Sequence, residues 1–538
     1  MLYCEEYWIP PMNAPLASPR VPAERAAPPK DLEIRPKQVK AWIDSLPLAQ
    51  TVDSARKMSA HLEGMNRAKV SADDRAAILE MYRTRAATIL EELEGIFGKA
   101  AMPIGARGRE ALNASRSLAS ALAAGYRIAL SETGGKLLGF GAKKQQPVLA
   151  LRAMEFLCTE LRASYKAYSP VPQGLWQDMH RLYVFADGEK LATEPGDAET
   201  KATVHDVYCE AVLLSLTDPY RLPSGEVDKI VAQIRGVRSL PTLGRARPAT
   251  KPGGHFIVPC DTDRGAKPML SASDDTGGPN WRLLDTNPIV DKLRQRKQAF
   301  DTGQMSAALA KTFTPDQLAL IARLITLWGD PPKRAHRRDP MDTQVAICVG
   351  LKSVTHFVAH EPKIDTQAEA AALKAGITIP LLAVPDDETS KQFPVYEWDV
   401  VNQSAGGAKL RREETTLQPV GIGDVVGLKF VGKGRWAIAV ARWITQLDEG
   451  GMECGVQFLS FAARPVWVKP KDSASPQMKQ GLVLEGGDGE EPSLLTLPSL
   501  YEDLRTYSLD DQGDNWDVRA SSLIEKTPRF ELFHFRSS

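Results

Sequence analysis

The hydrophobic pattern of this 538-residue chain changes its period near Gly329. Before this glycine, apolar residues recur at the three- and four-residue spacing of one buried helix face. After it, apolar and polar residues alternate in short runs bounded by glycine or aspartate, which is typical of strands in a small barrel. The sequence therefore predicts two or more domains of different class, and the chain is too long for one ordinary core.

The N-terminal part is predicted to be an all-α helical bundle or a short solenoid. One clear helix begins at Ser71, an N-cap with Asp74 three residues later, and ends near Gly98. Another begins at Thr314, which is followed by proline and, three residues on, by glutamine. Further helices are expected at 110–132, 147–168, 174–186, 201–217, 226–237 and 288–300.

The C-terminal part is predicted to be an antiparallel β-barrel with extra strands. The barrel strands are expected at 343–349, 352–358, 393–401, 408–411, 424–431, 436–443, 453–459 and 465–468. Residues 365–375 have high helix propensity, which predicts a helical insertion near 360–390. The tail carries further strands that either extend the barrel or form a second small sheet; these are 481–484, 493–497, 503–508, 516–520 and 530–535.

These patterns divide the chain into four predicted segments. Residues 1–30 are rich in proline and alanine and lack the features of a signal peptide, so they are predicted to be a disordered lead-in. Residues 31–328 form a mainly helical region, in which one short strand is expected at 255–259. Residues 329–470 form the barrel, and residues 471–538 form a β-rich extension.

The composition argues against several classes of protein. Lys and Arg together number 67, as do Asp and Glu, so the net charge is zero and no DNA partner is expected. No apolar run reaches the roughly 18 residues that span a bilayer, which predicts a cytoplasmic chain without a transmembrane segment. The six cysteines and eight histidines show no metal-ligand spacing, and common catalytic motifs are missing, so neither a metal, a cofactor nor an enzymatic activity is expected.

A basic cluster lies at the boundary between the helices and the barrel. Three of its cations are Arg334, Arg337 and Arg338. Two prolines precede the cluster and disfavour continuation of a helix, so a loop leading into the first strand is predicted. The spacing Arg-x-x-x-Arg from Arg334 to Arg338 arises easily by chance, and a solvated linker is the alternative interpretation.

A turn rich in short polar residues and glycine lies 64 positions after Arg338. The segment 398–410 is predicted to be a strand, a tight turn and a second strand, with Asn402, Ser404 and Gly407 at the turn. Asparagine and serine supply donors and acceptors, and glycine lets the backbone come close to a ligand. Taken alone, the segment is equally compatible with an ordinary hairpin turn.

Together the two motifs resemble the PilZ family. Its signature is Arg-x-x-x-Arg before a barrel, then Asp/Asn-x-Ser-x-x-Gly at a turn between early strands, and the resemblance covers roughly residues 331–470. It implies cyclic di-GMP as the ligand, whose guanines and phosphates suit the fork of a guanidinium. The ligand contacts that it implies are Arg334, Arg338, Asn402, Ser404 and Gly407.

Three more cations are candidates for the same site. Arg337 is a plausible phosphate contact, and Lys409 and Arg411 alternate with apolar residues and so share one face of a strand. The separation of the two motifs exceeds that of typical PilZ domains, and the predicted helical insertion accounts for the excess.

The resemblance implies a bacterial receptor that couples cyclic di-GMP binding at the barrel to a protein partner of the helical region, in control of motility, pili or surface attachment. One alternative is a PilZ-like scaffold that makes protein contacts without nucleotide. A second alternative is a barrel that binds single-stranded nucleic acid. Its stacking platforms would be Trp398, Trp436, Trp443 and Trp467, although alternation more often places such residues in a core.

Overall fold

The structure is a computed structural model in which most of the chain is described. The described residues are 16, 18–22, 26–47, 49–134, 140–246, 253–269, 271, 277–278, 280–305, 313–332, 337–360, 392–413, 419–430, 435–447, 450–472, 477–485, 491–511 and 513–537. They fall into two compact units. The first comprises residues up to Ala100, Ala106–Pro219 and Ser224–Lys333, and the second comprises Ala101–Gly105, Tyr220–Pro223 and Arg334–Ser538.

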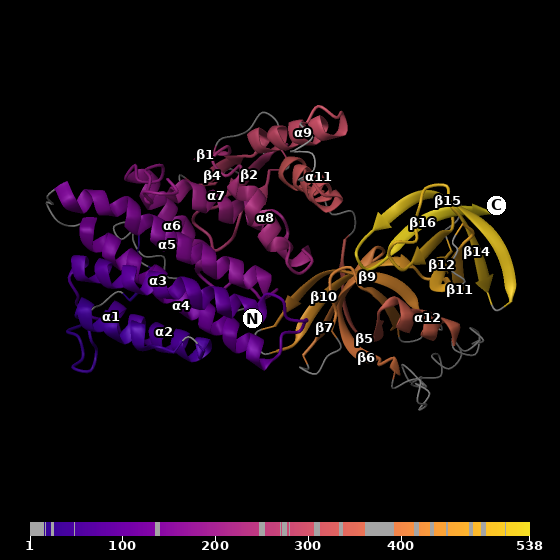
Figure 1. Cartoon of the computed structure of the whole chain (residues 1–538), viewed down its shortest axis with the longest axis horizontal. Coiled ribbons are helices and arrows are strands. Elements are labelled where there is room, and N and C mark those ends of the chain that lie inside the picture. The colour runs from indigo at the N-terminus through magenta and orange to yellow at the C-terminus, as the bar shows by residue number, and fades with distance from the viewer. Residues whose placement is uncertain are drawn as a thin grey trace. The chain divides into compact units, whose positions relative to one another are not determined.

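Helices build most of the first unit, as the sequence predicts (Figure 1). They are α1 (Pro36–Ser45), α2 (Thr51–Arg67), α3 (Ala72–Phe97), α4 (Ala106–Gly134), α5 (Phe140–Lys166), α6 (Leu175–Gly188), α7 (Val204–Ser215) and α8 (Glu226–Arg235), with a short 3-10 turn, η1 (Pro219–Arg221). Helix α4 packs against α2, α3 and α5. The predicted cap of α3 is confirmed, because the Ser71 hydroxyl accepts from the Asp74 amide at 3.1 Å.

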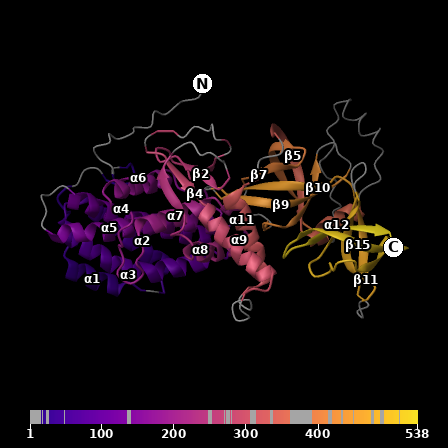
Figure 2. The same cartoon turned by 90° about the horizontal axis from the view of Figure 1, so that it is seen from above.

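A small sheet and a helix pair complete this unit. The strands β1 (Thr242–Arg245), β4 (Arg282–Asp285), β2 (His255–Val258) and β3 (Lys267–Pro268) lie in that order, where only one strand was predicted. Helices α9 (Asn287–Asp301) and α11 (Pro315–Gly329) pack side by side (Figure 2). The predicted start of α11 is confirmed by a capping box between Thr314 and Gln317.

Part of the predicted disordered lead-in is packed against the helices. Arg20 donates to the buried carboxylate of Glu160 at 2.6 Å and to that of Asp178 at 3.3 Å. Arg127, which is also buried, pairs with Asp178 at 2.9 Å and donates to the carbonyl of Leu16. The prediction of disorder is therefore wrong for these described residues, because a buried ionic cluster holds them.

The second unit contains a first closed barrel with the strand order β10-β7-β6-β5-β8-β9. All neighbouring strands are antiparallel, so the predicted C-terminal antiparallel barrel is confirmed. The strands are β5 (Asp339–Val349), β6 (Tyr396–Ser404), β7 (Gly407–Arg412), β8 (Val425–Phe430), β9 (Ala437–Gln446) and β10 (Met452–Ser460). The predicted insertion at 365–375 lies outside the described residues.

The tail forms a second closed barrel, with the order β11-β12-β13-β16-β15-β14. Its strands are β11 (Ala463–Pro470), β12 (Lys479–Leu484), β13 (Ser493–Thr496), β14 (Thr506–Asp511), β15 (Asp514–Lys526) and β16 (Glu531–Ser537). The segment 465–468 was predicted to belong to the first barrel, but it lies in β11, which pairs with β12 and β14. Two alternatives were predicted for the tail, an extension of the first barrel or a separate small sheet. The structure shows a separate sheet, which closes into a second barrel.

The two barrels share one pattern of strand pairing. If the six strands of each are numbered in chain order, the neighbours in both are 1–2, 2–3, 3–6, 6–5, 5–4 and 4–1, all antiparallel. The second barrel therefore repeats the topology of the first.

The predicted strand at 352–358 is wrong, because this segment is the helix α12 (Leu351–Ala359). Gly350, at φ 94°, ends β5 and redirects the chain. Valine and threonine mimic a strand here, yet the buried residues fall at helical spacing, on Leu351, Val354 and Val358. They join one apolar cluster with Ile438 and Val440 of β9 and with residues of the second barrel, which are Leu482, Leu484, Leu495, Phe530 and Leu532.

Removal of the Arg20 guanidinium should destabilise the helical unit. Arg20→Ala leaves the buried Glu160 carboxylate without its cation, which should cost about 3 kcal/mol and lower the thermal midpoint by roughly 6 °C at neutral pH. Burial already raises the pKa of Glu160 above its ordinary 4.5. The deficit should therefore shrink as the pH falls toward that value, since a protonated Glu160 needs no cation.

Thermal denaturation between pH 7 and pH 4.5 measures this effect. Arg35→Ala is the matched control, because Arg35 pairs with Glu33 at the surface and its loss should change the midpoint little. An Arg20→Ala deficit that is equal at both pH values would contradict the role assigned to Glu160.

Candidate functional site

Pairing of β5 with β6 joins the two motifs that are far apart in the sequence. Arg338 immediately precedes β5, whose first residue, Asp339, lies opposite Gln403. The next residue, Pro340, lies opposite Asn402. Arg338, the end of the basic segment, is thus adjacent to the turn, although 63 residues separate it from Asn402 in the sequence.

A β-bulge lies at the start of the turn. On the β7 side, the register shifts between Val400 and Asn402, so Val401 is an extra residue on β6. A bulge breaks the alternation of a strand and re-aims the side chains beside it. The side-chain oxygen of Asn402, Oδ1, is buried and has no hydrogen-bond partner among the described residues. The Ser404 hydroxyl donates to the carbonyl of Gly407 at 3.3 Å, which closes the turn.

Gly407 is required by the packing of the strands themselves. A Cβ atom at this position would lie 2.2 Å from the carbonyl oxygen of Val456 in β10. The neighbouring Gly406 accepts a hydrogen bond from the Phe458 amide at 3.1 Å. The glycines therefore let the turn lie directly against β10, so the room that Gly407 leaves on this side is already taken by backbone.

The cations near the turn differ in how they are held. Arg337 has a side chain that is 93% exposed and only a distant contact, at 3.9 Å, with Asp339. Lys409 is paired with Glu453 at 2.8 Å and Arg411 with Glu413 at 3.0 Å. Arg338 is exposed, whereas Arg334 lies outside the described residues.

The strand face predicted for Lys409 and Arg411 agrees with the structure. Their neighbours Ala408 and Leu410 are buried, so the two cations project from the opposite face of β7. Burial raises the pKa of the Cys454 thiol in the adjacent β10 to about 12. This thiol is therefore protonated at neutral pH and adds no negative charge near the cations.

Of the four tryptophans considered as stacking platforms, two lie in the core. Trp398 and Trp436 are 4% and 3% exposed, so neither can stack on a base from solvent. Trp443 is half-buried, and Trp467 is 46% exposed but belongs to the second barrel. The stacking surface expected of a single-strand binder is thus not assembled by these residues.

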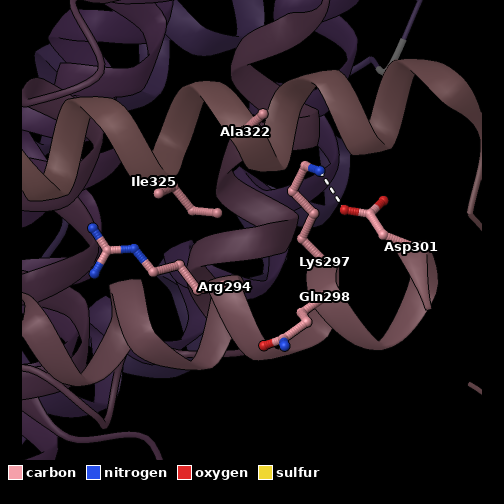
Figure 3. Close-up of a pocket in the computed structure, with 6 residues that line it drawn as sticks. All are labelled: Arg294, Lys297, Gln298, Asp301, Ala322 and Ile325. Carbon is pink, nitrogen blue, oxygen red and sulfur yellow. Dashed lines mark hydrogen bonds and ion pairs between the residues drawn. The ribbon is translucent and has the colours of Figure 1, made fainter. Parts of the chain in front are cut away.

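One further pocket, of about 430 Å³, lies between α9 and α11 in the first unit (Figure 3). Lys297 on its rim is paired with Asp301 at 2.6 Å, and Arg294 extends away from this pair. The pocket contains neither motif. Among the described residues, no group of three or more His, Cys, Asp or Glu side chains is placed to hold a metal ion.

Comparison with known proteins gives matches to two models of one family. The family model described as the N-terminal domain of the cyclic-di-GMP receptor FimW matches residues 37–246. The model described as its middle PilZ domain matches residues 255–377 and 381–465. The chain belongs to the FimW family of PilZ-domain receptors. The cyclic-di-GMP receptor FimW of Pseudomonas aeruginosa is 25% identical over 587 aligned residues, covering 98% of this chain and 94% of the relative.

The FimW family match extends over the whole first barrel and stops at the start of the second. The PilZ match begins at residue 255, well before β5, and ends at residue 465, within β11. No solved structure matches the chain. None of the helices in the described part of this FimW-family chain is long and apolar enough to cross a membrane.

The second barrel of this FimW-family chain lacks both PilZ motifs at the corresponding places. Its first strand follows β10 after only two residues, Phe461 and Ala462, so no basic segment precedes it. The connection between its second and third strands is Glu-Gly-Gly-Asp-Gly-Glu-Glu-Pro, residues 485–492. Four acidic residues in this connection would repel phosphates. The second barrel therefore has the same topology as the first but not the same ligand site.

Sequence reasoning missed the residues that surround the turn from β9 and β10. Gln457 lies opposite Gly407, and Arg442 donates to the Gln457 side chain at 2.8 Å. No local pattern marks either residue, because the register between β7 and β10 decides which residue of β10 meets the turn.

The contact of Gly407 with Val456 predicts the effect of a single added methyl group. Gly407→Ala should destabilise the first barrel by about 1–3 kcal/mol, because the Cβ can fit only if the two strands separate. Chemical denaturation followed by tryptophan fluorescence measures the loss. Gly95→Ala in α3 is the control, since nothing lies within 4 Å of its Cβ and a helical alanine should be neutral or stabilising. Equal stability of both variants would contradict the close approach.

Proposed function

We propose that this chain binds cyclic di-GMP at the first barrel, between the basic segment that ends at Arg338 and the turn from Asn402 to Gly407. The pairing of Asp339 and Pro340 with Gln403 and Asn402 supports the proposal, because it brings Arg338, the last residue of the first PilZ motif, next to the second motif. Membership of the FimW family supports the same ligand, since the Pseudomonas aeruginosa relative is a cyclic-di-GMP receptor.

The basic segment provides the charge that the ligand requires. Cyclic di-GMP has two phosphates and two guanines, and a guanidinium can bind a phosphate in a fork or donate to guanine O6 and N7 together. The exposed Arg337 and Arg338 are free to move toward the turn, because no close ion pair holds them within the described part of the chain. Arg334, from the same segment, would be a further guanidinium contact to the ligand.

The turn provides groups for a guanine edge. An unpaired buried acceptor such as Asn402 Oδ1 costs free energy, so a side-chain rotation that gives it a guanine N–H donor is favoured. Ser404 lies two residues on and can exchange its bond with Gly407 for a bond to the ligand. Lys409 and Arg411 must leave Glu453 and Glu413 before they bind phosphate, so their contribution should be smaller and sensitive to salt.

The role that follows is binding rather than catalysis. Binding of the ligand between the basic segment and the turn would favour one arrangement of the residues that follow α11. A protein partner that binds the helical unit would then respond to this change of arrangement. Control of pili or surface motility, a protein partner and a cytoplasmic location remain predictions. The alternative of a scaffold that does not bind nucleotide predicts a partner whose binding ignores cyclic di-GMP.

Calorimetric titration with cyclic di-GMP tests the proposal. The unaltered chain should bind at micromolar ligand or below, and Arg334→Ala with Arg338→Ala should weaken binding roughly tenfold or more, because charge-assisted contacts are lost. Asn402→Ala should weaken binding less. A control with the same charge change is Arg294→Ala with Lys297→Ala, at the pocket between α9 and α11.

Three results would contradict the proposal. They are the absence of heat from the unaltered chain, equal affinity of the double-arginine variant, and loss of binding in the control pair alone. The last result would move the site to the pocket in the helical unit.

A further inference from the structure

Gln457 extends the face of the turn onto the neighbouring strand. Across three strands the register aligns Ser404 with Gly407 and Gly407 with Gln457. Residues directly opposite one another on paired strands share a face of the sheet. Gly407 has no side chain, and the backbone of β10 lies where its Cβ would stand, so no side chain intervenes between Ser404 and Gln457. Gln457 is exposed, while Val456 and Phe458 on either side of it are buried.

The orientation of the Gln457 amide is set by Arg442. The Nε–H group of Arg442 donates to Oε1 of Gln457 at 2.8 Å. This bond engages the acceptor end of the amide. The NH2 end makes no hydrogen bond to any residue that the structure describes, so it presents two donors at the surface. Donors are what guanine O6 and N7 and phosphate oxygens require.

Arg442 is in turn held by the second barrel. Its two terminal nitrogens donate to Glu525 of β15 at 2.5 Å and 2.7 Å, in a bidentate pair. Both side chains are 26% exposed, so solvent screens the pair only in part. A bidentate pair of this kind fixes the plane of the guanidinium as well as its position.

Strand irregularities place both partners. The register between β9 and β10 shifts from the Gly455–Trp443 pair to the Val456–Ala441 pair, so Arg442 is the extra residue of a β-bulge. On β15 the register shifts between Leu523 and Glu525. Bulges re-aim side chains, so the bridge between the barrels occurs where each strand departs from regular pairing.

We propose that Gln457 is a further contact for the ligand and that Glu525 of the second barrel positions it through Arg442. This inference rests on the proposed function. The second barrel lacks both motifs, and its role by this inference is to orient the Gln457 amide at the ligand site of the first barrel.

Binding of cyclic di-GMP to variants of the full chain tests the inference. Gln457→Glu replaces the two donors by a carboxylate oxygen at almost unchanged volume, and should weaken binding about tenfold. Glu525→Gln, which keeps the shape but loses the charge, should weaken binding about threefold by freeing Arg442. Asp472→Asn is the matched control: it alters an ion pair with Arg505 at 2.8 Å within the second barrel and should leave the affinity unchanged.

A charge exchange separates positioning from simple stabilisation. Arg442→Glu combined with Glu525→Arg can restore the ion pair and with it the thermal midpoint. The carboxylate at position 442 would accept from the Gln457 NH2 group and so engage the donors that the ligand needs. The affinity should therefore stay at least threefold below that of the unaltered chain although the stability recovers.

The outcomes are distinct. Full affinity in Gln457→Glu, or full recovery of affinity in the charge exchange, would overturn this inference and leave the proposed function standing. Failure of the unaltered chain to bind would overturn both. Should Glu525→Gln lower the thermal midpoint by more than Asp472→Asn does, Gln457→Glu still decides the question, because the exposed Gln457 is not needed for the fold.

Discussion

The antiparallel pairing of β5 with β6 is the constraint on which the site depends. It fixes Asp339 opposite Gln403, and so places Arg338, the end of the basic segment, beside the turn. A shift of this register by one residue would send every side chain of a strand to the other face. The buried Val345 and Trp398, which lie opposite each other, oppose such a shift because both would leave the core.

Closure of the barrel extends this constraint to the opposite side of the turn. Since β7 pairs with β10 as well as with β6, Gly407 lies between Ser404 and Gln457. The backbone of Val456 occupies the space where a side chain would stand, which explains why glycine is needed there whether or not ligand is bound. Gly407 is thus needed for the packing of β7 against β10, and it places no side chain between Ser404 and Gln457.

Repetition of the barrel shows that topology and binding are separable. Both barrels pair their six strands in the same way, yet the basic segment and the polar turn occur in the first alone, and an acidic connection replaces the turn in the second. The second barrel is joined to the first by the apolar cluster around α12 and by the pair between Arg442 and Glu525. Its contribution is therefore structural support of the first barrel and, by our inference, orientation of Gln457.

The sequence by itself determined the class of each half, the caps at Ser71 and Thr314, and the two motifs, because these depend on residues close together in the chain. It did not determine that α12 is a helix, since a short run of branched residues fits either period until packing chooses one. Nor did it show that Arg20 is buried in an ionic cluster. Tertiary structure alone decided which residues meet across 64 positions and that Gln457 faces the turn, because strand register is set by the packing of the whole barrel.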